Sequence, residues 1–385
     1  MKRQKIVLIP FLCLVLFSQP GFGRTANQAR REIQIPDILG YHTLKCDLHM
    51  HSVFSDGYVW PTVRVKEAWI EGLDAISITD HLEWLPHKDL VSTDFNQPFL
   101  LAKKMADDAG LILIQGAEIT RGMPPGHLNA IFLEDVNALQ QDDWRESIKV
   151  AIDQKAFLFW NHPGWKGQQK DGVSHWYDEH TELFEKDWLK GIEVVNYNEY
   201  YPEVQQWCLD KDLTMLGNSD VHDPTNLVWN FCDGEHRPMT LVFASEQTAE
   251  GILKALLHQR TVVYYQDTLI GKAKYLDAIF AESIEIITPE LILQGNKPAF
   301  LQIHNHSDIS YSLVRDGKLD DISFPEKVTL QPHKTVRLPL RGESDQTRGK
   351  YLIHLPYRVS NLWVAPREGL KIDLSLIVEY QVPEE

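Results

Sequence analysis

Residues 44–258 alternate short β-rich runs with helix-favouring segments, and this alternation limits the fold more than any other feature. Strands are predicted at residues 44–49, 73–78, 111–119, 127–133, 156–161, 191–196 and 214–218. Helices are predicted near residues 61–71, 99–109, 144–154, 177–187, 202–212 and 247–258. Strands separated mostly by helices predict parallel βα units, and therefore an α/β barrel or a doubly wound sheet.

The character of the sequence changes after residue 271. Residues 328–340, 351–355 and 372–380 alternate apolar and polar side chains, and helical periodicity disappears. This pattern is typical of a half-buried antiparallel sheet. We therefore expect an α/β domain over residues 24–270 and a C-terminal β-sandwich over residues 271–385. The two should pack closely, because no low-complexity linker separates them.

The first 23 residues have the pattern of a secretory signal. Lys2, Arg3 and Lys5 form a basic start, an apolar run follows at residues 6–17, and Gly21 and Gly23 provide small residues for cleavage. The apolar run is too short to span a bilayer, so no membrane span is expected. We expect export to the periplasm or the extracellular space.

Charge restricts the class of partner. The formal net charge is −16 at pH 7, whereas a protein that neutralises a phosphate backbone needs a basic surface. We therefore expect no nucleic-acid polymer as a partner. A small anionic substrate is still compatible with this charge, because bound metal ions can neutralise it locally. The sequence carries no signal for an oligomeric state.

A His-x-His pair follows the first predicted strand. On a strand, residues two apart point to the same face, so His49 and His51 can bind one metal ion. A second pair, His304 and His306, lies in the β-rich tail, where we interpret it as structural. The first pair is more informative because other metal-binding residue types stand at the ends of successive predicted strands. They are Asp56, His81, Glu118, His127, His162, Asp220 and His222. The carboxyl ends of barrel strands form active sites, so we expect these side chains to meet in one cleft.

These motifs resemble those of the PHP family, named for polymerase and histidinol phosphatase. The resemblance spans residues 44–260 and is carried by His49-x-His51, Asp56-Gly57, Thr79-Asp80-His81, Glu118, His162-Pro163 and Asp220-x-His222. It implies a distorted (β/α)7 barrel, which agrees with the seven predicted strands, and a trinuclear metal centre that hydrolyses phosphoesters. With its signal and added β domain, the chain looks most like the secreted Sb-PDE-type phosphodiesterases.

The resemblance also implies a ligand set, and two or three divalent ions of zinc, manganese or iron. Metal one would be held by His49, His51, Glu118 and Asp220; metal two by Glu118, His127 and His162; metal three by Asp56, His81 and His222. Paired cations screen phosphate charge and activate water, so we expect a metal-bridging hydroxide to attack the phosphorus of a small phosphodiester, and also of monoesters. We assign catalytic roles to Glu118, Asp220 and His222, with His222 or metal three assisting the leaving group.

Further polar and aromatic residues near these motifs are weaker candidates. Arg121 and Lys166 are predicted to bind phosphate oxygens. Asp47 and Asp80 are expected either to orient imidazoles or to cap helices, and Glu193 to point toward the barrel mouth. Residues Trp165, His175 and Trp176 would form either a stacking wall or buried loop anchors.

Two other functions fit parts of the sequence. An amidohydrolase-type metal hydrolase also has a barrel with His-x-His on its first strand, but it typically lacks the Thr-Asp-His and Asp-x-His motifs. A non-catalytic cell-envelope binding protein would keep metals for structure and use the β domain for recognition. The intact ligand sets argue against this second alternative, because a structural barrel does not need a bridging glutamate.

Overall fold

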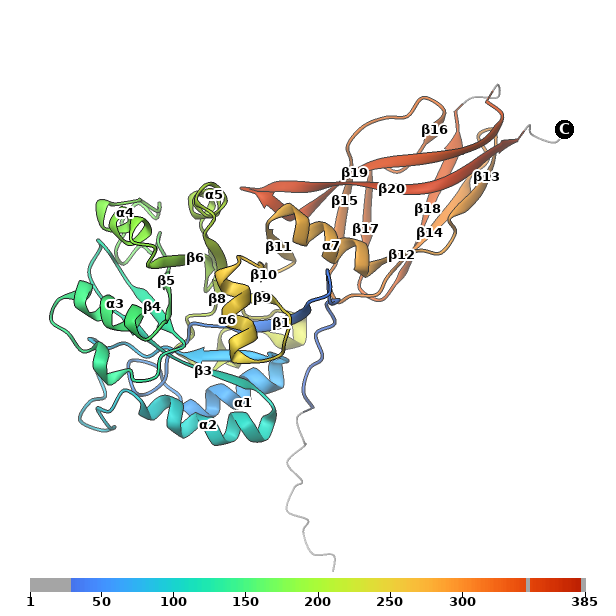
Figure 1. Ribbon diagram of the computed structural model, residues 1–385. Coiled ribbons are helices and arrows are strands. Elements are labelled where there is room, and N and C mark those ends of the chain that lie inside the picture. The colour runs from blue at the N-terminus through green and yellow to red at the C-terminus, as the bar shows by residue number, and fades with distance from the viewer. Residues whose placement is uncertain (1–28, 344–346, 382–385) are drawn as a thin grey trace, which may run out of the picture.

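The computed structural model describes residues 29–343 and 347–381, so the predicted signal at residues 1–23 lies outside the described part. A mixed α/β domain is followed by an elongated all-β domain, and the two are drawn in Figure 1 in blue to yellow and in orange to red. The predicted two-domain α/β and β architecture is confirmed.

The α/β domain is a distorted barrel. Its main strands are β1 (His42–Asp47), β2 (Ala75–Ile78), β3 (Ile112–Ile119), β4 (Leu128–Ile131), β5 (Phe157–Trp160), β6 (Leu189–Asn196) and β8 (Thr214–Asn218). Neighbours in this order are hydrogen-bonded, and a parallel bridge between Met50 and Val221 joins the chain after β1 to the chain after β8. The carboxyl ends of β1 and β8 therefore lie side by side.

Helices cover the outside of the barrel, as Figure 1 shows. They are α1 (Pro61–Glu71), α2 (Gln97–Ala109), α3 (Trp144–Asp153), α4 (Asp178–Glu185), α5 (Pro202–Lys211) and α6 (Ala249–Leu257). Short 3-10 turns lie at η1 (Asn137–Leu139), η2 (Thr225–Leu227) and η3 (Phe231–Asp233). Pro61 begins α1, where a missing N–H costs nothing, and Gly72 ends it with φ of 89°.

The predicted parallel order fails at β4, which runs antiparallel to both β3 and β5. Only residues 120–127 connect β3 to β4, and a parallel crossover needs about a dozen residues or more. The reversal brings His127, at the start of β4, to the same end of the barrel as the carboxyl end of β3. Four further strands were not predicted: β7 (Glu199–Tyr200), β9 (Met239–Ala244), β10 (Thr261–Tyr265) and β11 (Thr268–Gly271).

The C-terminal part is a β-sandwich preceded by a helix. The helix α7 (Ala273–Ser283) contradicts the expectation that helices end at residue 271. One sheet contains β12 (Ile284–Ile286), β14 (Ala299–Asn305), β16 (Ile322–Ser323) and β18 (Thr335–Gly342). The facing strands are β13 (Glu290–Gln294), β15 (Tyr311–Arg315), β17 (Lys327–Leu330), β19 (Gly349–Ala365) and β20 (Glu368–Gln381).

The two domains are joined by backbone pairing as well as by side chains. β11 pairs in parallel with β19, so one sheet runs from the barrel into the sandwich. The Asn361 side chain donates hydrogen bonds to the carbonyl oxygens of Asp267, at 2.6 Å, and Ser310, at 2.7 Å. These contacts fix the β10–β11 turn against the sandwich.

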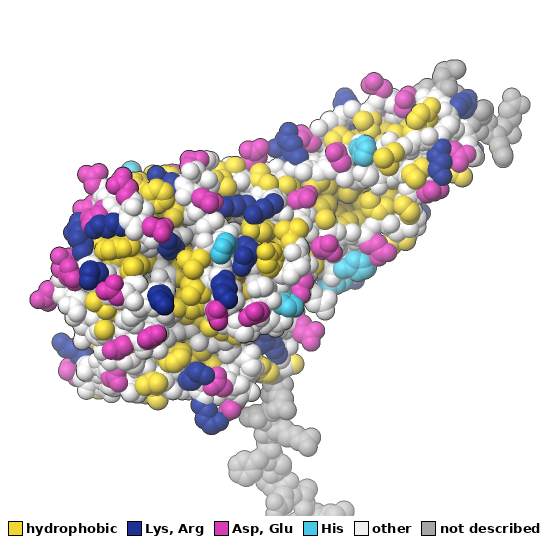
Figure 2. Space-filling view, in the orientation of Figure 1, with side chains coloured by type: hydrophobic (Ala, Val, Ile, Leu, Met, Phe, Trp, Pro, Cys, Tyr) yellow, Lys and Arg dark blue, Asp and Glu magenta, His cyan; other side chains and the backbone are white. Residues whose placement is uncertain are grey.

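The surface of the molecule carries both signs of charge. Figure 2 shows acidic and basic side chains interspersed on the visible face of the barrel domain, without a continuous basic patch. Within the described residues, no helix combines the length and the apolar character needed to cross a bilayer.

Candidate metal centre

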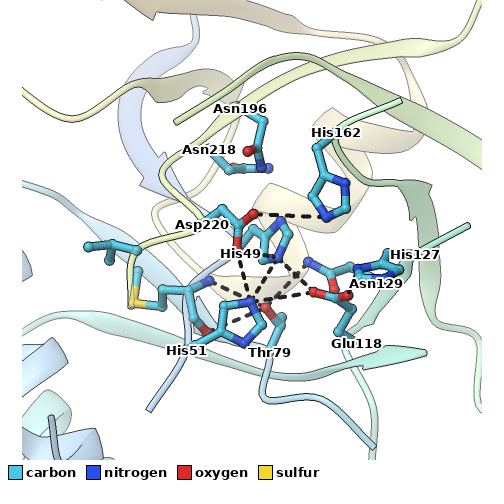
Figure 3. Close-up of polar contacts among 12 residues, drawn as sticks. His49, His51, Thr79, Glu118, His127, Asn129, His162, Asn196, Asn218 and Asp220 are labelled. Carbon is cyan, nitrogen blue, oxygen red and sulfur yellow. Dashed lines mark hydrogen bonds and ion pairs between the residues drawn. The ribbon is translucent and has the colours of Figure 1, made fainter. Parts of the chain in front are cut away.

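The predicted ligands converge at the carboxyl ends of the barrel strands. His49 and His51 follow β1, His81 follows β2, Glu118 lies in β3, and the remaining ligand candidates are His127, His162, Asp220, His222 and Asp56. Figure 3 shows His49, His51, Glu118 and Asp220 pointing toward one another, with His127 and His162 beside them. The side chains of His49, His51 and Glu118 are fully buried.

Four donor atoms from this set surround a single point. His49 Nε2 lies 3.1 Å from His51 Nε2, 2.9 Å from Glu118 Oε2 and 3.2 Å from Asp220 Oδ1. His51 Nε2 lies 3.4 Å from the same glutamate oxygen and 3.0 Å from the same aspartate oxygen. A tetrahedral ion about 2.0–2.1 Å from each ligand separates the ligands by roughly 3.3 Å. The observed spacing therefore fits one divalent ion.

The protonation of His49 supports the same conclusion. Its Nδ1 lies 2.8 Å from Glu193 Oε1, where an ionised carboxylate accepts an N–H. In the neutral imidazole, Nε2 then carries a lone pair and faces two carboxylate oxygens and another imidazole nitrogen. Burial lowers the pKa of His49, but the carboxylates of Asp220 and Glu193 outweigh this effect and raise the pKa well above its ordinary value, so a cation is favoured at this position. The donor set therefore fits a metal ion.

Two further groups of ligand atoms share residues with the first. One contains His51, Asp56, His81 and His222, and the other contains His81, Glu118 and His127; within each group all ligand atoms lie within 4.8 Å of one another. The third predicted set is thus brought together, with His51 added. The second differs, because His81 replaces His162, whose Nε2 lies 3.9 Å from Asp220 Oδ2.

Glu118 connects the groups through its two oxygens. Its Oε2 faces His49 and His51, whereas Oε1 lies 2.5 Å from His127 Nδ1. His127 Nδ1 is buried and has no hydrogen-bond partner of suitable geometry among the described residues. This is expected if His127 Nδ1 and Glu118 Oε1 both face a common ion. Burial raises the pKa of Glu118, but the imidazoles of His81 and His127 outweigh this effect and hold the pKa well below its ordinary value.

Two of the candidate ligands have strained backbones. The φ angle is 50° at Asp220 and 29° at His162, a region that non-glycine residues rarely occupy. Such strain is kept where the surrounding structure requires a particular side-chain direction, and it clusters at functional sites. Burial and the neighbouring His127 lower the pKa of His162 to about 3, so its imidazole is neutral, which is the form that binds metals.

Glu193 lies directly behind His49 and is fully buried. Its Oε1 accepts hydrogen bonds from His49 Nδ1 and from Asn218 Nδ2, the latter at 2.9 Å. Its Oε2 accepts bonds from the backbone N–H of His162 and from Asn196 Nδ2, both at 2.8 Å. Glu193 thus positions two candidate ligands from behind rather than facing the barrel mouth.

Replacing Glu193 with Gln tests this positioning role. An amide cannot accept at both of its atoms, so one pair of donors loses its acceptor and the His49 ring loses its fixed tautomer. We expect metal affinity to fall by about 10- to 100-fold, with the fold retained. Titration with zinc, followed by competition with a chelator, measures this change. Unchanged affinity would show that Glu193 does not position His49.

The other candidates from the second tier have different partners. Asp80 accepts hydrogen bonds from the Ser52 N–H, at 2.6 Å, and from Ser55 Oγ, at 2.8 Å, so it braces the loop that follows His51. Asp47 accepts a 2.6 Å bond from Ser219 Oγ and pairs with buried Arg237 at 2.8 Å. Both carboxylates hold the loops on which ligands stand, and their described side-chain contacts include no imidazole.

The two predicted phosphate-binding cations lie outside the cluster. Arg121 pairs with Glu83 at 3.0 Å and donates to the Gln141 carbonyl at 2.9 Å. Lys166 is exposed, and its side chain lies over Gly172. Neither residue lines the cavity above the metal ligands. The side chains of Arg121 and Lys166 thus have their contacts outside the ligand cluster.

The predicted stacking wall is present in part. Trp165 lies over the imidazoles of His127 and His162, with ring centroids 5.8 and 5.3 Å away. Trp176 instead packs against Trp160 and Trp207, so it is a partly buried anchor of the barrel. His175 is exposed and pairs with Asp171 at 2.9 Å.

Sequence reasoning missed several residues that hold the site. Asn196 and Asn218 end β6 and β8, and their position at strand ends could have marked them. Arg64, in α1, donates to the carbonyl oxygens of His51, Val221 and His222. An arginine within a helix normally indicates solvent, so the sequence carries no signal for this buried role.

A cavity of about 420 Å³ lies directly above the ligands. It is lined by Asp56, His81, His127, His162, Trp165, Asn196, Tyr197, Glu199, Asp220, His222, Asp223 and Val228. Its volume suits a small organic ligand. Among the described residues, no lysine or arginine lines it, so the groups that could offset the charge of an anionic ligand are its imidazoles and metal ions bound beside them.

Comparisons with known proteins agree with this geometry. The chain resembles a two-domain protein from Bacteroides vulgatus that contains a predicted PHP-like metal-dependent phosphoesterase. The two structures have a TM-score of 0.86 and 45% sequence identity, and the match covers 90% of this chain and 99% of that one. An Ig-like domain model matches residues 284–375. An uncharacterized protein of Methanocaldococcus jannaschii is 39% identical over 83 residues, which are 21% of this chain and 36% of that protein.

The extent of the Bacteroides match decides the family. The PHP resemblance predicted from the strand-end motifs is confirmed, and it takes precedence over the amidohydrolase alternative. The chain belongs to the PHP-like metal-dependent phosphoesterases, with a C-terminal Ig-like domain.

Proposed function

We propose that this protein is a phosphodiesterase that works with two or three divalent ions. The observation that carries the proposal is the set of four donor atoms, from His49, His51, Glu118 and Asp220, spaced 2.9–3.4 Å apart. Glu118 extends this set toward His127 and His81. Donors shared in this way are typical of sites that hold neighbouring ions.

Some residues of the site would bind the ions, and others orient the ligands or shape the cavity. Divalent ions bound here would screen the charge of a phosphate group and lower the pKa of bound water. Glu193 keeps the His49 ring oriented, and Glu118 spans the groups. Trp165 lies beside His127 and His162 and forms part of the cavity wall.

Preference for diesters follows from the charge of the cavity. Apart from the candidate metal ligands, its lining contains the carboxylates of Glu199 and Asp223, and among the described residues no lysine or arginine. A monoester dianion carries one more negative charge into this surrounding than a diester monoanion does. Like charges repel more strongly in a partly buried site than in water, so the diester is favoured.

The contacts of His222 support its predicted role as a metal ligand. Its Nδ1 lies 2.8 Å from the Asp220 carbonyl oxygen, which can only accept, so Nδ1 carries the proton. In the neutral ring, Nε2 then presents a lone pair toward Asp56 Oδ1, 3.1 Å away. We propose that His222 binds a metal ion; its assistance to the leaving group stays a prediction.

Hydrolysis by metal-loaded protein tests the proposed function. The full chain is stripped with a chelator and then reloaded separately with zinc, manganese or iron. With the best metal we expect kcat/KM for bis(4-nitrophenyl) phosphate to exceed that for 4-nitrophenyl phosphate by at least about tenfold. The stripped protein should be inactive. A monoester preference would contradict the diester assignment, and no hydrolysis with any metal would contradict the proposed function.

The site of action is a separate proposal. The basic and apolar pattern of residues 2–23 supports export. We expect the protein found in the periplasm or the medium to begin near residue 24. N-terminal sequencing after cell fractionation identifies this first residue. Retention in the cytoplasm with residues 1–23 intact would contradict export.

A further inference from the structure

A second cavity opens beside the candidate metal centre. It has a volume of about 380 Å³ and is lined by Asp56, Tyr58, Pro86, Trp84, His87 and His222. Asp56 and His222 also line the cavity above the ligands, so the two spaces meet at these two side chains. A phosphodiester has two ester groups, and one bound at the metals could extend one group into each space.

Exposed aromatic rings gather around the two cavities. Tyr58 is 67% exposed and Trp84 is 58% exposed in the side cavity, while Trp165 and Tyr197 are 45% and 41% exposed in the main one. Of the large exposed tryptophans and tyrosines in the described residues, only Trp60 and Tyr351 lie elsewhere. Exposed apolar surface concentrated in one place marks a binding region.

The charged side chains of the side cavity restrict the chemical class of its ligand further. Among the described residues its lining includes no lysine or arginine; its ionisable side chains are Asp56, His87 and His222, and two of these are candidate metal ligands. A second phosphate, as in a nucleoside diphosphate, would therefore find no guanidinium or ammonium group there. An uncharged flat ring would instead find aromatic faces on which to stack.

We propose that Tyr58 and Trp84 form a subsite that binds a planar aromatic ring carried by one ester group of the substrate. The inference rests on the proposed function, because it places the phosphate at the metal ligands. It assigns a substrate class: a single phosphodiester whose ester group carries an aryl or nucleobase ring, without further phosphates.

Equilibrium binding tests the subsite independently of turnover. The probes are diphenyl phosphate, the dinucleoside monophosphate thymidylyl-thymidine, and diethyl phosphate, each titrated calorimetrically into metal-loaded full-length protein. We expect the wild type to bind a ring-bearing diester at least about tenfold more tightly than diethyl phosphate. Tighter binding of diphenyl phosphate would indicate an aryl ring in the substrate, and tighter binding of thymidylyl-thymidine would indicate a nucleobase.

Variants then locate the subsite. Trp84→Ala and Tyr58→Ala should each lose most of the preference for a ring while binding diethyl phosphate as the wild type does, and Trp84→Phe should keep it. The control Tyr351→Ala removes another exposed ring, 49% exposed, on the β-sandwich and should change nothing. Thermal unfolding midpoints confirm that each variant is folded.

The possible outcomes separate the two proposals. A wild type without preference for rings, or variants that keep the full preference, would overturn the subsite. If the ring preference is present and depends on Trp84, but no diester is hydrolysed, the subsite stands and the proposed function fails.

Discussion

Glu118→Gln is expected to lower kcat/KM for a diester by on the order of a thousandfold and to release part of the bound metal. The carboxylate presents Oε2 to His49 and His51, and Oε1 to His127 and His81. An amide keeps one oxygen, and its NH2 group cannot bind a cation. The variant therefore disrupts more than one of the ligand groups at once.

Elemental analysis together with diester kinetics measures this effect. Glu285→Gln is a matched control, because Glu285 is exposed and pairs with His306 of the second His-x-His motif at 2.9 Å. It should retain full metal content and activity. A Glu118→Gln protein with unchanged metal and turnover would contradict the assignment of Glu118 as a shared ligand.

Arg64→Met is expected to lower the free energy of unfolding by about 3–5 kcal/mol, an effect of the size seen when a buried charge loses its partner. The Arg64 side chain is fully buried. It donates to the His51 carbonyl at 2.8 Å, to those of Val221 and His222 at 3.0 and 2.6 Å, and to that of Asp223 at 2.8 Å. It also pairs with Glu67 at 2.8 Å. Methionine fills similar space but leaves these acceptors without a donor.

Urea unfolding measures this loss, and Arg145→Met is its control. Arg145 also pairs with a carboxylate, Glu182, at 2.7 Å, but its side chain is 42% exposed, so its removal should cost less than about 1 kcal/mol. Because Arg64 ties the chain after His51 to the chain after Asp220, the Arg64 variant should also bind metal more weakly. Equal stability losses in the two variants would show that Arg64 does not organise the site.

The features that the sequence predicted well are those with local signals. Periodicity and Pro61 located α1 over its observed bounds, and apolar runs located β2 and β5 within two residues. The candidate ligands were found because metal-binding residue types stand at the ends of predicted strands, and their grouping came from the PHP resemblance. The structure places Glu118 and Asp220 each within hydrogen-bonding distance of His49. Family membership was carried by the same residues.

The features that could not be predicted from the sequence depend on long-range contacts. The direction of β4 is set by the short 120–127 connection, which apolar patterning does not report. The helix α7 begins two residues after β11, and the alternating segments that follow concealed it. Arg64 contacts Val221 and Glu193 contacts His49, in each case a partner more than 100 residues away, and neither residue type indicates such a role by itself.

The central claim is that side chains from position 49 to position 222 hold a shared group of divalent ions. Anomalous diffraction at the absorption edge of the bound metal, from crystals of the loaded full-length protein, tests it most directly. We expect a peak bounded by His49, His51, Glu118 and Asp220, and at least one more beside Glu118 or Asp56. Loaded crystals without a peak at this cluster, or with metal only at the His304–His306 motif, would contradict the account.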